Sequence, residues 1–192
     1  MNDAAQVLNK TGAIVVVPTD TIYGVVARAQ DMAAVQRLYN LKSRENKPGT
    51  LVAASIDQLV ELGLKRRYLT AVEQFWPGAV SVIIPCSDPA LAYLHQGKMS
   101  LAVRIPEDKK FLSILKDTGP LITSSANLPD QDPAETVEQA QNYFGDKVDY
   151  YQDGGSLKGR QPSTLIRIVD DAIEVLRSGT VEVDEGTGKI ST

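Results

Sequence analysis

VVVPTDTIYG, residues 15–24, is the stretch that decides the fold. The β-branched run that begins at residue 14 predicts a buried strand, because branched side chains pack well on a pleated sheet. Pro18 cannot donate to a sheet ladder, so we expect the strand to end there and the chain to turn back into a second apolar stretch at residues 25–29. The mouth of this strand carries Thr19, Asp20 and Thr21. Polar groups on a rigid strand end are typical of small-molecule sites, although an ordinary corner with self-bonded side chains is the alternative.

The length and composition indicate a globular protein. The chain has 192 residues, 43% hydrophobic and 23% charged, so we expect one domain over residues 1–180, followed by a loose polar tail at 181–192. A formal charge of −4 gives no general reason to bind nucleic acid or an anionic membrane. Cys86 is the single cysteine, the start is not that of a signal peptide, and no apolar run approaches the ~20 residues of a spanning helix. We expect a cytoplasmic protein without membrane contact.

Strand-like and helix-like segments alternate along the chain, which is typical of an α/β fold with a mixed, strongly twisted sheet. Asp31 is expected to cap a helix whose inward face carries Met32, Val35, Leu38 and Tyr39. The other predicted helices cover residues 4–9, 55–62, 66–75, 107–116 and 135–144. The predicted strands cover residues 14–17, 25–29, 50–54, 80–84, 101–105, 121–123, 147–151, 164–169 and 173–176.

Several common chemistries are not expected. His95 is the sole histidine and has no nearby cysteine, so neither a Ser-His-Asp triad nor a His/Cys zinc site is predicted. The sequence GTGK at residues 186–189 resembles part of a phosphate loop, but Val183 and Ile190 stand where such a loop needs Gly and Ser or Thr. The chain also lacks the GxGxxG fingerprint of dinucleotide-binding folds. We expect no metal ion bound by the protein itself.

The remaining polar and basic groups follow the ends of predicted strands and helices, and together they describe a concave anion site. Arg104 interrupts an apolar strand, which costs desolvation unless an anion or a carboxylate meets it. A structural ion pair is the alternative for Arg104. For Lys42 and Arg44 the alternative is a solvated helix C-terminus. For Ser124 and Ser125 it is a turn or a helix cap.

An ordered set of motifs resembles the YrdC domain family over about residues 4–180. The motifs are PTDTIYG (18–24), KSR (42–44), WPG (76–78), VRIP (103–106), SAN (125–127), DGG (153–155), ST (163–164) and LRSG (176–179). The resemblance implies a single twisted α/β domain around a large, positively lined cavity. It also implies threonylcarbamoyl-AMP synthase activity, in which L-threonine, bicarbonate and ATP give threonylcarbamoyl-adenylate and pyrophosphate. The product feeds threonylcarbamoyladenosine modification of tRNA through a downstream transferase complex, and direct contact with RNA is possible.

The resemblance further implies roles for individual residues. Threonine contacts are expected from Thr21, Arg104, Thr123 and Ser163. ATP contacts are expected from Arg44, Lys47, Ser100, Ser125, Asn127 and Arg177, and the catalytic basic groups are Lys42 and Arg44. No tightly bound cofactor is implied, and Mg²⁺ should travel with ATP. Such a reaction needs positioning and stabilisation of phosphate charge rather than a covalent nucleophile.

One loop departs from the family pattern. Residues 128–133, LPDQDP, follow the SAN motif where the family usually has a short Ser-Gly loop, which bears on the ATP contacts expected after Asn127.

Two other functions stay open. One is an adenylating relative that uses carbamoyl phosphate, and the other is a non-catalytic RNA-binding module, which the net charge of −4 disfavours.

Overall fold

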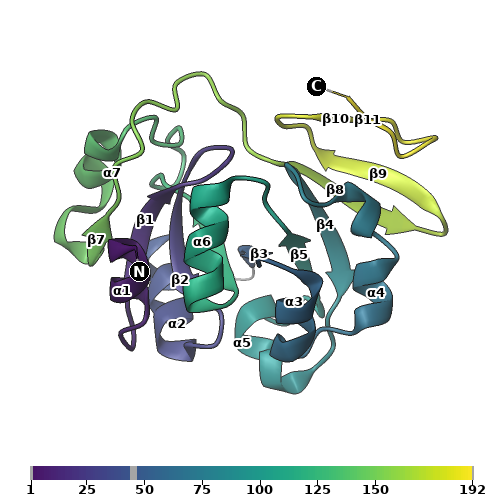
Figure 1. Ribbon diagram of the computed structural model, residues 1–192, viewed down its shortest axis with the longest axis horizontal. Helices are drawn as coiled ribbons and strands as arrows, with labels where there is room; N and C mark the ends of the chain where they lie inside the picture. The colour runs from purple at the N-terminus through teal and green to yellow at the C-terminus, as the bar shows by residue number, and fades with distance from the viewer. Residues whose placement is uncertain (1, 44–46, 192) are drawn as a thin grey trace.

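The β-branched runs of the sequence come together in one mixed sheet of nine strands (Figure 1). The computed structural model describes residues 2–43 and 47–191. In spatial order the strands are β7 (Tyr150–Tyr151), β1 (Ile14–Pro18), β2 (Tyr23–Arg28), β6 (Leu121–Ser125), β3 (Thr50–Val52), β5 (Ser100–Arg104), β4 (Val80–Pro85), β8 (Thr164–Val169) and β9 (Ala172–Arg177). The pairs β1–β7, β3–β5 and β4–β8 are parallel and the others are antiparallel. The predicted α/β class with a mixed sheet is confirmed.

Alternate strand residues place two apolar clusters on opposite faces of the sheet. Val15 and Val17 pack with helices α1 (Asp3–Leu8) and α6 (Lys109–Thr118), whereas Ile14 and Val16 belong to the other cluster. The second cluster also takes the buried residues of α2 (Met32–Leu41), α3 (Ile56–Leu62), α4 (Arg66–Thr70), α5 (Ala92–His95) and α7 (Val137–Phe144). Single 3₁₀ turns lie at Glu73–Phe75, Pro89–Leu91 and Gly145–Lys147. The helices within the described residues are all too short or too polar to cross a membrane.

Helix α2 begins as predicted and differs in one inward residue. The carboxylate of Asp31 accepts the N–H of Ala34, 3.0 Å away, which confirms the predicted cap. Leu38 and Tyr39 are buried, but the prediction for Met32 is wrong, because 60% of this residue is exposed. Met32 lies in the first turn, beyond the part of the helix that contacts the sheet.

Asp31 also holds the turn before β1, because its second carboxylate oxygen accepts the N–H of Gly12 at 2.7 Å. Burial alone would raise the pKa of this carboxyl, but the N–H groups of Ala34 and Gly12 outweigh burial and hold the pKa below its ordinary value of 3.8. Asp31 therefore links the start of α2 to the start of the sheet, and its charge contributes to stability.

We expect Asp31→Ala to lower the free energy of unfolding at neutral pH by about 1–2 kcal/mol, because two backbone donors lose their acceptor. The carboxylate's contribution is complete above the unfolded pKa and is lost as the pH falls through the lower folded pKa. Urea denaturation should therefore show a smaller deficit at about pH 3 than at neutral pH. Asp31→Asn, which still caps the helix, is the control. An Asp31→Ala deficit that does not change with pH would contradict this account.

The C-terminal segment differs from the loose tail expected at residues 181–192. Strands β10 (Glu182–Val183) and β11 (Ile190–Ser191) pair as a hairpin, and Val183 is buried in the main apolar cluster. The hairpin is tied to the sheet by hydrogen bonds from Thr164 Oγ1 to the carbonyl of Val181 and from the N–H of Val175 to Glu185. Figure 1 shows the hairpin beside β8 and β9, at the opposite end of the molecule from α1.

Candidate functional site

The sheet face that carries α1 and α6 is apolar over one part and polar over the next. Leu121 of β6 and Val52 of β3 are paired and lie in the cluster under α6. Two residues further along β6, Thr123 pairs with Val26 and with Thr50, and next to Val52 across the sheet lies Arg104. Directly paired residues share a face, so these polar side chains project from the same face as the apolar cluster. The polar part of this face forms the floor of a pocket.

The pocket has a volume of about 210 Å³. Its walls come from the β1–β2 turn, from β3, β5 and β6, from the residues before β8, and from the end of β9. Six of the predicted site residues line it: Thr21, Arg104, Thr123, Ser125, Ser163 and Arg177. The structure therefore brings together residues that are up to 156 positions apart, counted from Thr21 to Arg177.

Thr19 and Thr21 shape the β1–β2 turn by local hydrogen bonds. Thr19 Oγ1 donates to the carbonyl of Ile22 at 2.7 Å and accepts the N–H of Thr21 at 3.1 Å. The two threonine hydroxyls are 3.1 Å apart. The alternative of a self-bonded corner thus describes Thr19, while the side chain of Asp20 leaves the turn and reaches the pocket's arginine.

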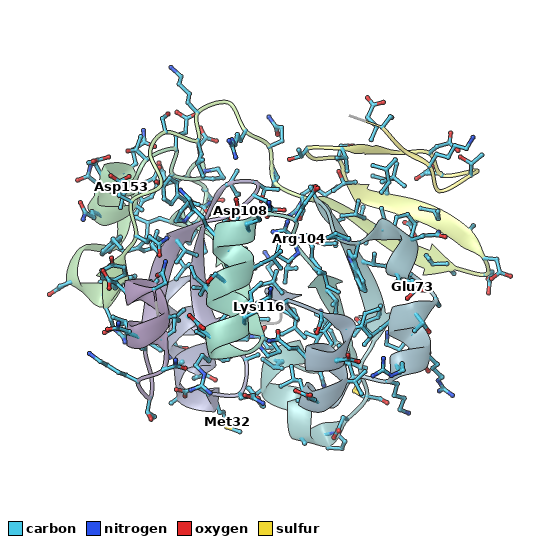
Figure 2. All side chains as sticks on the ribbon, in the orientation of Figure 1. Met32, Glu73, Arg104, Asp108, Lys116 and Asp153 are labelled. Atoms are coloured by element: carbon cyan, nitrogen blue, oxygen red, sulfur yellow. The ribbon has the colours of Figure 1, made fainter. Side chains whose placement is uncertain are left out.

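Asp20 and Arg104 form a nearly buried ion pair. Nη1 of Arg104 lies 2.7 Å from each carboxylate oxygen, and the side chains are 4% exposed for Arg104 and 13% for Asp20. Nε of Arg104 is buried, and no group in residues 2–43 or 47–191 bonds to it. The ion pair predicted as the alternative for Arg104 is therefore present, and its arginine lines the pocket. Figure 2 shows Arg104 near the centre of the molecule.

Ser163 and Arg177 meet at the far wall. The guanidinium of Arg177 donates to the carbonyl of Ser163 at 2.8 Å, and the hydroxyl of Ser163 lies 2.9 Å from that of Ser81 on β4. Two residues after Arg177, the backbone of Gly179 packs against residues 162–164. A Cβ atom on Gly179 would lie only 2.1 Å from the carbonyl oxygen of Pro162. Only glycine allows this approach, which fixes the end of β9 against Ser163.

Lys42 is hydrogen-bonded to the SAN motif at the end of β6. Its ammonium is within hydrogen-bond distance of three oxygens: the carbonyls of Ser125 and Asn127 and the side-chain oxygen of Asn127. Ser125 Oγ also donates to the Asn127 side-chain oxygen at 2.6 Å, and the amide nitrogen of Asn127 donates to the carbonyl of Gln131. The ammonium group thus fixes the backbone that leads into the loop at residues 128–133.

Five predicted site residues do not line the pocket or lie outside the described residues: Lys42 and Asn127, placed above, and Ser100, Lys47 and Arg44. Ser100 begins β5, four residues before Arg104, which is ~13 Å along a strand, and its hydroxyl donates to the carbonyl of Lys98. Lys47 is exposed, next to Pro48, which does line the pocket. Arg44 lies outside the described residues.

In the part of the chain that the structure describes, His, Cys, Asp and Glu form no group of three that could hold a metal ion.

Sequence reasoning named Asp20 only as one of the polar groups at the end of the first strand, and it gave no role to Ser81 or Tyr23. Tyr23 accepts the N–H of Gly154 and donates to the carbonyl of Gly155, each at 2.8 Å, and burial raises the pKa of this phenol. It thereby ties the connection after β7 to the PTDTIYG turn. Asp20 and Tyr23 belong to the PTDTIYG motif and Ser81 lies three residues after the WPG motif, but a motif alone does not indicate which partner each side chain meets.

A family model for Sua5, YciO and YrdC proteins, described as telomere recombination, matches residues 7–179. The chain belongs to this Sua5/YciO/YrdC family. Among its family relatives, a putative threonylcarbamoyl-AMP synthase of Mycobacterium tuberculosis is 33% identical over 180 residues, which covers 91% of this chain and 82% of the relative. The threonylcarbamoyl-AMP synthase of Bacillus subtilis is 29% identical over 186 residues and covers 94% of this chain, which spans only 54% of that relative.

The fold matches a solved family member. The crystal structure of P. abyssi Sua5 complexed with L-threonine superposes with a TM-score of 0.82 at 27% identity. The match covers 94% of this chain and 54% of the P. abyssi chain. This Sua5/YciO/YrdC chain therefore spans about half the length of that protein.

Proposed function

We propose that this protein is a threonylcarbamoyl-AMP synthase, a nucleotidyltransferase that uses L-threonine, bicarbonate and ATP. The observation that carries the proposal is the convergence of Arg104, Arg177 and the hydroxyls of Thr21, Thr123 and Ser163 in one pocket. Two cationic groups and several hydroxyls suit an amino acid beside a phosphate chain. The relatives named above support the same activity.

In the proposed reaction the threonine amine and bicarbonate first give a carbamate and water. A carbamate oxygen then forms a bond to the α-phosphorus of ATP, and the bond from that phosphorus to the β-phosphate oxygen breaks, which releases pyrophosphate. The protein has to align the two substrates and stabilise charge on the phosphates, and positioned Arg and Lys groups provide both. Mg²⁺ would enter on the phosphates of ATP and neutralise part of their charge.

We assign the pocket of about 210 Å³ to threonine. Its volume is below the ~300–1,000 Å³ typical of pockets for drug-sized ligands, so ATP must extend beyond it. We assign Arg177 and Lys47, with Arg44 as the resemblance implies, to contacts with ATP. The product would pass to an enzyme complex that modifies tRNA.

The test is pyrophosphate release from ATP in bicarbonate buffer, with and without L-threonine. We expect threonine to stimulate release by at least about 10-fold and L-serine to stimulate it less, because a buried site distinguishes one missing methyl group by about 1 kcal/mol or more. Release that requires carbamoyl phosphate instead would favour the carbamoyl-adenylating relative. Salt-dependent RNA binding without any ATP turnover would favour the binding module and contradict the synthase.

A further inference from the structure

Asp20 has no part in the reaction described above, yet its carboxylate is paired with Arg104, which lines the proposed threonine site. Both of its oxygens lie 2.7 Å from Nη1 of Arg104, and the residue stands between Thr19 and Thr21, which both line the pocket. Only 13% of its side chain is exposed. A carboxylate this close to a substrate-binding arginine must affect which ligands that arginine accepts.

Asp20 leaves one edge of the Arg104 guanidinium unused. Asp20 contacts Nη1 alone, so the edge formed by Nε and Nη2 is not used by this pair. Nε is buried, and the described chain offers it no hydrogen-bond partner. A guanidinium binds carboxylates best through two parallel bonds, so the second edge suits the carboxylate of a bound amino acid. Two carboxylates would then share one guanidinium.

Two negative groups on one cation repel each other at low exposure to water. The repulsion is relieved when the ligand brings its own positive charge next to its carboxylate, as an α-amino acid does with its ammonium. A hydroxy acid or another simple anion brings no such charge. The Asp20–Arg104 pair is therefore complementary to a zwitterion and unfavourable for a lone anion, including a phosphate group of ATP.

We propose, on the basis of the proposed function, that Asp20 determines the specificity of this site for a zwitterionic amino acid. Arg104 takes the ligand's carboxylate, and Asp20 attracts the ammonium and disfavours anions that lack one. A purely structural ion pair would instead hold Arg104 in place and treat all ligand carboxylates alike. The two hypotheses therefore predict different effects on the ratio of the affinities for different ligands, and not only on the affinity itself.

The experiment compares L-threonine with 2,3-dihydroxybutanoate, in which a hydroxyl replaces the ammonium. Titration calorimetry gives the Kd of each ligand for the wild type and for Asp20→Asn, which keeps the shape of the side chain and removes its charge. We expect the wild type to bind threonine more tightly by about 10–100-fold, the usual effect of one charged hydrogen bond. In Asp20→Asn we expect this ratio to fall towards one, with threonine binding weakened and binding of the hydroxy acid unchanged or improved.

Asp57→Asn is the matched control, because Asp57 pairs with Arg66 at 2.6 Å on the surface, with 72% of its side chain exposed. It should leave both Kd values unchanged. Asp20→Glu, which retains the charge, should preserve most of the discrimination and serves as the second variant if Asp20→Asn does not fold. Equal weakening of both ligands in Asp20→Asn, or an unchanged ratio, would overturn the proposal.

These binding measurements separate the two proposals. If the wild type discriminates the ligands and Asp20→Asn does not, Asp20 has the proposed role even where no pyrophosphate is released, and only the synthase activity fails. If the wild type releases pyrophosphate with threonine and Asp20→Asn keeps the ratio of Kd values, the synthase stands and the role of Asp20 is overturned.

Discussion

Arg104→Ala is expected to raise the KM for threonine by about 10–150-fold, which corresponds to the loss of one charged hydrogen bond. It should also destabilise the protein, because Asp20 would keep a negative charge in a nearly buried place without its cation. Removing one partner of a buried ion pair costs about 3–5 kcal/mol, and we expect the lower value because Asp20 retains some contact with water.

A double variant separates the two effects of this substitution. Arg104→Ala combined with Asp20→Asn removes both charges, so the unfolding free energy should recover most of the loss while threonine binding stays weak. Steady-state kinetics and urea denaturation on the single and double variants provide the two readouts. A normal threonine KM in either variant would remove Arg104 from the threonine site.

Lys42→Met is expected to have the second large effect. The substitution keeps the length and the apolar stem of the side chain but removes the donors that three oxygens of Ser125 and Asn127 now accept. Buried acceptors left without a donor cost about 1–3 kcal/mol each, so we expect the unfolding free energy to fall by about 3–5 kcal/mol. Activity should fall by at least about 10-fold, because the SAN motif loses its anchor.

Thermal denaturation and steady-state kinetics together test this role. Lys65→Met is the matched control, since Lys65 is an exposed lysine at the start of a helix and should change neither readout. If Lys42→Met kept full stability and lost only kcat, the ammonium would act on the substrate rather than on Ser125 and Asn127. That result would return Lys42 to the catalytic role implied by the resemblance.

Local patterns predicted most of the elements, because each depends on neighbours in the sequence. The β-branched runs gave the strands, and Asp31 gave the start of α2. The helix predicted over residues 66–75 is instead α4 followed by a separate 3₁₀ turn at Glu73–Phe75. Thr70 at the break bonds back to the carbonyl of Arg66, a competing local bond that periodicity does not reveal. Helix α5, only four residues long, was not predicted at all.

Long-range partners could not be predicted from patterns. Arg104 and Asp20 are 84 positions apart, and Lys42 and Asn127 are 85 apart. The sequence offered an ion pair and a substrate contact as alternatives for Arg104, but the choice depends on which strands are neighbours. The insertion of β6 between β2 and β3 decides this, and no local signal encodes that insertion. The family resemblance supplied six of the residues that line the pocket, whereas the partners of Asp20 and Ser81 emerged only from the three-dimensional contacts.

The strand order has a consequence during translation. The first six strands to leave the ribosome, β1 to β6, occupy six consecutive places in the sheet, whereas β7 joins one edge and the β8–β9 hairpin joins the other. Thr21, Arg104 and Thr123 therefore leave the ribosome together with the six strands that form the middle of the sheet. Ser163 and Arg177 reach the pocket only after a further 40 residues, counted from Thr123 to Ser163. The pocket is therefore complete only once the last of its residues, Arg177, has been translated.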